Sequence, residues 1–106
     1  MTNIYRAMSD PIRRKILSKL AKAEQTQSEI VREFEISQPA ITKHLRILKE
    51  EGLISEARRG RYRIYSLDRS AFESAYQAML QEIDTMLGRT LEDLKNYVEN
   101  KGGEDD

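Results

Sequence analysis

The side chains most suited to chemistry gather in one short stretch of the chain, residues 37–46. Ser37 can cap a helix there, and Pro39 fits the first helical turn because the amide it lacks would have no partner anyway. The polar and basic side chains that follow supply hydrogen-bond donors and acceptors, as base edges and nearby phosphates require. Those that helical spacing places on one exposed face are Gln38, Thr42, Lys43, His44 and Arg46. The stretch therefore predicts a helix that binds nucleic acid.

Four arginines form a second cationic element further along the chain. Two alternating apolar runs, residues 53–57 and 62–67, flank Gly60 and predict a β-hairpin. Guanidinium groups at the tip of a hairpin suit the DNA backbone or an adjacent minor groove. The arginines around the predicted tip are Arg58, Arg59, Arg61 and Arg63. One basic residue on a helix is most often only solvated, but two cationic elements at this spacing favour DNA.

Helices must position both elements. The apolar spacing predicts helices over residues 2–9, 11–23, 28–34 and 37–51. In the last of these, Ile41, Leu45 and Leu48 would be buried, and Gly52 would end the helix. A short helix, a turn and a helix that starts with polar residues form the geometry in which the second helix enters the major groove. Residues 10–67 are therefore expected to be the DNA-reading part.

The last helix is expected to be long. Apolar residues recur every three or four positions and predict a helix of about eight turns over residues 69–99. A body of this size cannot cover so long an apolar edge, so the expected cover is a second copy of the chain. The side chains expected at the dimer interface are Ile4, Tyr5, Met8, Phe72, Tyr76, Met79, Ile83 and Leu87. Gly88 interrupts the helix and could allow a bend, and residues 101–106 are expected to be a disordered tail.

Length and composition bound these expectations. A chain of 106 residues suffices for one domain, which we expect over residues 1–100. The formal net charge is zero, yet it is +4 over residues 38–65 and −6 over residues 66–106, so the basic middle suits a polyanion. The chain has no cysteine and no run of about 20 apolar residues. We therefore expect a cytoplasmic protein without membrane insertion.

The chain offers little that an enzyme needs. It has one histidine and no cysteine, and it lacks a glycine-rich phosphate loop and any recognisable serine–histidine–acid spacing. We expect no cofactor. One alternative is a metal sensor built from carboxylates and His44, although a lone histidine is more often a hydrogen-bonding group. Another is a protein-interaction module, because fold alone never fixes function.

The chain resembles the ArsR/SmtB group of winged helix-turn-helix repressors over about residues 4–68. The resemblance rests on three segments found together, AMSDPIRRKIL, EIVREFEISQPAITKHLRILKEEGLI and RRGRYRIYSL. It implies a mostly α-helical bacterial protein in which four helices precede a small β-hairpin and a fifth follows it. It further implies a homodimer formed by the first and last helices, with the fourth helix reading double-stranded operator DNA. Such a dimer would read an inverted repeat.

The resemblance also implies which residues face DNA. Carried over, they are Ser37, Gln38, Ala40, Thr42, Lys43, His44 and Arg46, with Arg59 and Arg61 in the hairpin. The chain departs from the founding members, because its third helix lacks their CxC-type thiolates and its last helix has no histidine to pair with Glu82 or Asp84. No metal is therefore expected. Members without metal ligands resemble autoregulators, or repressors released by a small molecule, a redox signal or a partner protein.

Overall fold

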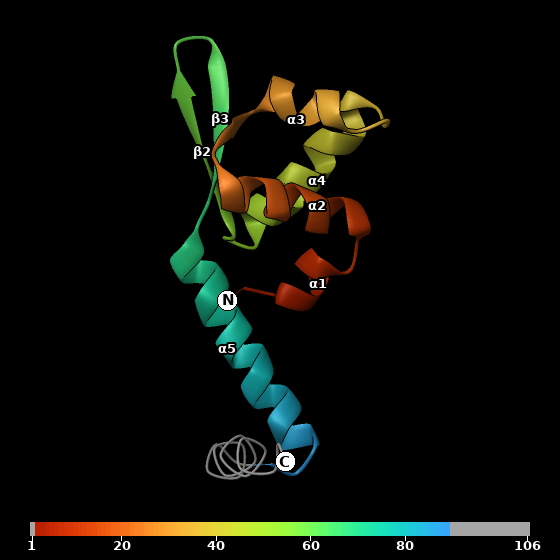
Figure 1. Ribbon diagram of the computed structural model, residues 1–106, viewed down its shortest axis with the longest axis vertical. Helices are drawn as coiled ribbons and strands as arrows, with labels where there is room; N and C mark the ends of the chain where they lie inside the picture. The colour runs from red at the N-terminus through yellow and green to blue at the C-terminus, as the bar shows by residue number, and fades with distance from the viewer. Residues whose placement is uncertain (1, 90–106) are drawn as a thin grey trace, which may run out of the picture. The chain divides into compact units, whose positions relative to one another are not determined.

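The computed structural model describes residues 2–89. It divides into two compact units, one that ends at Ala75 and one that begins at Tyr76. The elements, labelled in Figure 1, are α1 (Ile4–Met8), α2 (Pro11–Lys22), β1 (Gln25–Thr26), α3 (Gln27–Glu33), α4 (Gln38–Glu50), β2 (Ile54–Arg59), β3 (Tyr62–Leu67) and α5 (Arg69–Met86). The fold is thus mostly helical with a small antiparallel β-hairpin, which confirms the expected fold class.

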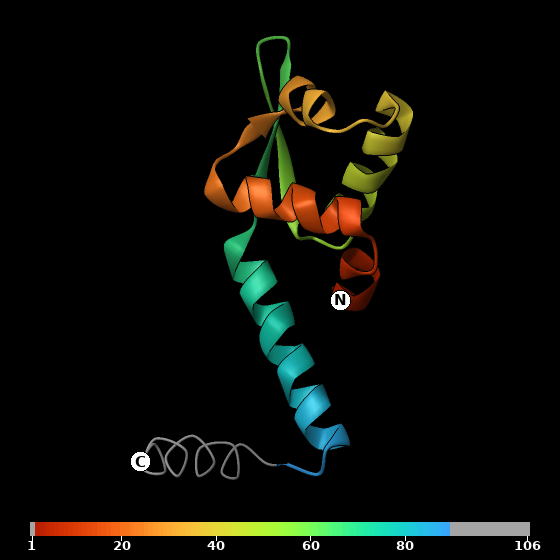
Figure 2. The ribbon, with the colours of Figure 1, turned by 45° about the vertical axis from the view of Figure 1, so that its right-hand side comes forward.

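One strand was not expected from the sequence. β1 adds to the hairpin and completes an antiparallel sheet of order β1-β3-β2. Its two residues, Gln25 and Thr26, pair with Tyr65 and Ile64, and two residues are too few to carry an alternating pattern. The pairing fixes the segment before α3 to the hairpin. As a result α3 lies nearer the tip of the hairpin and α2 nearer its base, which both Figure 1 and Figure 2 show.

The core of the first unit lies between the helices and the sheet. The largest fully buried side chains are Ile16, Ile30, Ile41, Leu45, Leu48 and Leu53. Burial of one such side chain contributes about 1.5–3 kcal/mol, so the apolar stripe of α4 alone holds that helix firmly in place. The stripe predicted from the sequence, Ile41, Leu45 and Leu48, is confirmed, since each is at most 2% exposed.

A capping box fixes the start of α3. The Thr26 hydroxyl accepts a hydrogen bond from the backbone of Glu29 at 3.1 Å, and the Glu29 carboxylate accepts one from the backbone of Thr26 at 2.9 Å. The backbone N–H of Thr26 holds the pKa of Glu29 below its usual value. Because the cap is Thr26, α3 begins and ends one residue earlier than the predicted helix 28–34.

The expectation of one continuous helix over residues 69–99 is wrong. α5 ends at Met86, where Gly88 adopts a φ of +70° that an L side chain rarely adopts. The backbone N–H of Gly88 bonds to the carbonyl of Thr85, and that of Arg89 bonds to the carbonyl of Asp84. These two bonds form a Schellman motif, which ends a helix instead of bending it. The rest of that prediction, residues 90–99, and the predicted tail 101–106 lie outside the described residues.

Candidate nucleic-acid interface

The first turns of α4 carry the predicted reading face. The Ser37 hydroxyl accepts a hydrogen bond from the backbone of Ala40 at 3.3 Å and so caps the helix, with Pro39 in the first turn. Since the apolar stripe of α4 is buried, the opposite face must be open. The exposed predicted residues are Ser37, Gln38, Thr42, Lys43 and Arg46.

Two residues of the predicted set lie differently. Ala40 is half-buried, and the His44 side chain is only 16% exposed. Nη1 of Arg13 lies 3.1 Å from Nδ1 of His44, and this ring nitrogen must accept because a guanidinium has no acceptor. Nε2 of His44 lies 3.9 Å from Asp10. The expectation that His44 faces outward is therefore wrong, because the ring is used inside the molecule by residues of a distant segment.

Arg13 itself was not singled out in the sequence, yet it is 7% exposed and central to the fold. Its Nε donates to the carbonyl of Ala7 at 3.1 Å, and its Nη2 donates to the carbonyl of Arg6 at 2.8 Å. Arg14 donates to the carbonyl of Met8 at 2.5 Å. Two arginines of α2 thus satisfy the last carbonyls of α1, where positive charge is also favourable to the helix dipole.

The C-terminal end of α4 is anchored to the segment around α1. The side chain of Glu51, 10% exposed, accepts hydrogen bonds from the backbone of Asn3 at 2.7 Å and from Arg6 at 2.8 Å. The Thr2 hydroxyl donates to the carbonyl of Glu51 at 2.8 Å. The Asn3 backbone N–H and the Arg6 guanidinium hold the pKa of Glu51 below its usual value. This end of the helix is therefore held by a carboxylate that stays charged.

One hydrogen bond joins the reading face of α4 to α3. Nε2 of Gln27, the first residue of α3, donates to Oγ1 of Thr42 at 3.3 Å. Gln27 was not among the predicted site residues. The pairing could not be found from sequence because it depends on how the two helices cross.

The hairpin brings the predicted arginines together around a tight turn. Gly60 has a φ of +63° at the first position of a two-residue turn, a conformation that favours glycine. Arg58 and Arg59 belong to β2, so the strands run further than expected and Arg58 pairs directly with Arg63. The Arg61 guanidinium lies 5.4 Å from the ring centre of Tyr62.

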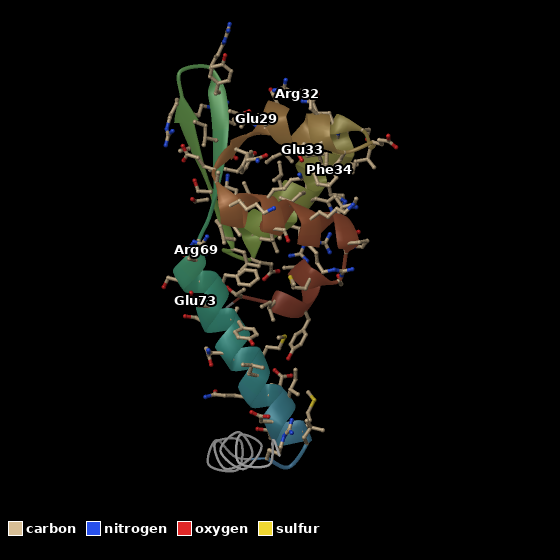
Figure 3. All side chains as sticks on the ribbon, viewed as in Figure 1. Glu29, Arg32, Glu33, Phe34, Arg69 and Glu73 are labelled. Carbon is tan, nitrogen blue, oxygen red and sulfur yellow. The ribbon has the colours of Figure 1, made fainter. Side chains whose placement is uncertain are left out.

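A groove of about 580 Å³ separates this hairpin from the start of α3 and α4. Gln27, Ser28 and Gln38 line it, together with four arginines. The four are Arg32, Arg58, Arg61 and Arg63. Among the described residues that line it, none is acidic, so the groove attracts anions. The sequence did not single out Arg32, which lies on the upper edge of α3 at the level of the hairpin in Figure 3.

Arg59 lies apart from the other hairpin arginines in its contacts. Its guanidinium forms a two-pronged pair with Glu24, at 2.7 and 3.2 Å. It does not line the groove. Both partners are substantially exposed, so the pair is worth little to stability, but it partly neutralises the charge that Arg59 can offer to a polyanion.

The residues expected at the dimer interface fall into three groups. Ile4 is only 5% exposed, so its place on an open apolar edge is a wrong expectation; the Asn3–Glu51 bond draws the start of α1 against the chain. The half-buried residues are Met8, Phe72 and Met79. The exposed ones are Tyr5, Tyr76, Ile83 and Leu87. Met86, which was not in the set, is 70% exposed.

Two further properties concern residues 2–89 alone. No helix among them is long and apolar enough to cross a membrane. No three of their histidine, aspartate or glutamate side chains lie close enough together to hold a metal ion.

Comparison with known proteins identifies the family. Residues 10–56 match the model of bacterial regulatory proteins of the arsR family. The chain is 40% identical over 84 residues to the transcriptional repressor SdpR of Bacillus subtilis, which covers 79% of this chain and 93% of that protein. The chain belongs to the ArsR family. A second relative in this range, the SmtB homolog of Synechocystis sp., is 31% identical over 79% of this chain and 66% of its own length.

Solved structures of the ArsR family share the fold. A crystal structure of an ArsR-family transcriptional regulator is 30% identical, with a TM-score of 0.71 over 82% of this chain and 94% of that chain. An ArsR-like regulator from Rhodococcus sp. RHA1 is 29% identical, with a TM-score of 0.69 over 89% of this chain and 88% of that chain. This ArsR-family chain is therefore a DNA-binding transcriptional repressor with a winged helix-turn-helix, and not an enzyme, as its sequence predicted.

Proposed function

We propose that the chain represses transcription as a homodimer on an inverted-repeat operator. In each half-site α4 enters the major groove, and the arginine-lined groove between α3 and the hairpin takes the phosphates beside it. The observation that carries this proposal is the adjacency of an exposed polar helix face and a groove with four arginines and no acid among its described lining residues.

Base reading is assigned to Gln38 and Thr42. Both are exposed near the start of α4, the part of a reading helix that contacts base edges. A glutamine amide carries a donor and an acceptor side by side and can pair with adenine through N6 and N7. Lys43 and Arg46 are exposed on the same helix and are assigned to phosphates, which fix the register without reading sequence.

Dimerisation is supported by apolar side chains of the second unit. Tyr76, Ile83 and Leu87 recur at helical spacing on one side of α5 and are 44%, 37% and 59% exposed. Water-exposed stripes of this kind mark contact sites between proteins. A charge at their centre, Ile83→Asp, should give monomers in sedimentation experiments at micromolar concentration, whereas the control Gln81→Asp should leave dimers. A wild-type monomer would contradict the proposal.

The deciding experiment is selection of binding sites from random DNA, followed by affinity measurements. We expect an inverted repeat with half-sites about one helical turn apart. Gln38→Ala should weaken binding to the selected site by about 1–3 kcal/mol and leave binding to random DNA nearly unchanged. A protein-interaction module would select no sequence. Enrichment of the region upstream of the chain's own gene would indicate autoregulation.

A further inference from the structure

Gln27 reaches the reading helix from a rigid position. Its backbone is the first residue of α3, fixed by the capping box of Thr26 and Glu29. The preceding residue, Thr26, is also held in the sheet opposite Ile64. The side-chain amide of Gln27 therefore extends from a fixed point to Oγ1 of Thr42, one turn after Gln38 along α4.

This hydrogen bond determines what the Thr42 hydroxyl has left to offer. A threonine hydroxyl has one proton and two acceptor lone pairs. Because Gln27 donates to the oxygen, the proton of Thr42 is not used in this bond and can point away from α3. In a major groove it would then find an acceptor, such as N7 or O6 of guanine, N7 of adenine or O4 of thymine. The N4 amino group of cytosine, which is itself a donor, would be less favourable.

We propose that Gln27 is a positioning residue that sets the hydrogen-bond polarity of Thr42, and with it the base preferred at one position of each half-site. This rests on the proposed function, because it requires α4 in the major groove. Gln27 also lines the arginine groove. DNA bound there would exclude water from the Gln27–Thr42 bond, and no solvent molecule would then replace the amide as donor.

The inference is tested by reversing the polarity of the partner. In Gln27→Glu the carboxylate can only accept, so the Thr42 hydroxyl must donate to it and turn its lone pairs outward. Selection from random DNA should then favour a donor-bearing base, cytosine or adenine, at the position that Thr42 contacts. In affinity measurements on single-base variants of the operator, preference at that position should shift by about fivefold, the equivalent of one hydrogen bond of about 1 kcal/mol.

Two further variants isolate the cause. Gln27→Met keeps the shape of the side chain but neither donates nor accepts strongly, so preference should weaken at that one position only. Ser28→Glu places the same added charge in the same groove, one residue away from Gln27, so it should weaken binding to every sequence without changing preference. All variants should retain the wild-type melting temperature, because the bond joins exposed side chains.

The outcomes separate this inference from the proposed function. If wild-type protein selects an operator but both Gln27 variants keep its base preference, the role of Gln27 is disproved and the function stands. If Ser28→Glu changes preference in the same way as Gln27→Glu, charge alone is the cause and the inference is again disproved. If wild-type protein selects no sequence, both proposals fail together.

Discussion

The two ends of α4 are built for different tasks. At its C-terminal end, Glu51 is bound by Asn3 and Arg6 and has little contact with water. Near its N-terminal end, Gln38 and Lys43 face outward, and Thr42 receives a hydrogen bond from α3. One helix can thus be fixed firmly at one end while the polar groups of its other end stay available to a partner. Variants at the two ends should therefore affect different quantities.

The largest effect is expected at the anchored end. Glu51→Ala removes the acceptor for two hydrogen bonds and should lower the free energy of unfolding by about 1.5–3 kcal/mol. Base preference should not change. Urea unfolding measures the effect, and Glu50→Ala is the matched control because Glu50 forms only an exposed pair with Arg6. Equal stability of the two variants would show that Glu51 does not anchor α4.

The same carboxylate should make stability depend on pH. The pKa of Glu51 is lowered in the folded chain, so the anchor stabilises the fold above the ordinary glutamate pKa of 4.5. This contribution is lost as the pH falls through the lower folded pKa. Glu51→Gln cannot titrate, so its free energy of unfolding should fall less than that of wild type below pH 4.5. Parallel acid curves for the two proteins would contradict the assignment.

A smaller effect is expected beside the open end of α4, where arginines line the groove. Arg61→Gln should weaken binding to all sequences and make the logarithmic salt slope shallower by about one unit for each phosphate that it leaves without a cation in each half-site. Arg59→Gln should change the slope less, because Glu24 already neutralises part of that charge. Affinity measured over a range of salt concentrations decides this. A larger change for Arg59→Gln would place the phosphates elsewhere on the hairpin.

No effect on either end is expected from chelation. The chain has no cysteine and one histidine, and His44 is engaged by Arg13, which leaves weak oxygen ligands for transition metals. Melting temperature and DNA affinity should be the same with EDTA and with added zinc. If EDTA lowered either value and zinc restored it, the chain would be a metal sensor with non-cysteine ligands.

The sequence predicted α4 well because the information there is local. Ser37, Pro39 and the apolar stripe lie within one helix, and capping and periodicity operate over a few residues. The contacts that hold and tune this helix depend on folding in three dimensions. Arg13 meets His44 across 31 positions of sequence, and no periodicity within either segment encodes that encounter.

Gly88 is a different case, because its signal was local and was weighed against a longer pattern. Apolar residues continue at helical spacing beyond it, which favoured one unbroken helix of residues 69–99. The backbone of Gly88 instead takes a left-handed φ and the Schellman bonds form. A single residue that stabilises a helix end can outweigh a periodic pattern, because periodicity reports only which face is apolar and not whether the backbone continues.

The arginine cap on α1 has a consequence for the order in which the protein folds. A helix of five residues does not persist alone in water, since helices shorter than about 12–15 residues are marginal. The carbonyls at the end of α1 are satisfied by Arg13 and Arg14 of α2, and Arg6 is bound at the end of α4. α1 can therefore form only once α2 and α4 have met. It is the last helix of the first unit to form and the first to open, and its amide hydrogens exchange with solvent before those of the helices it rests on.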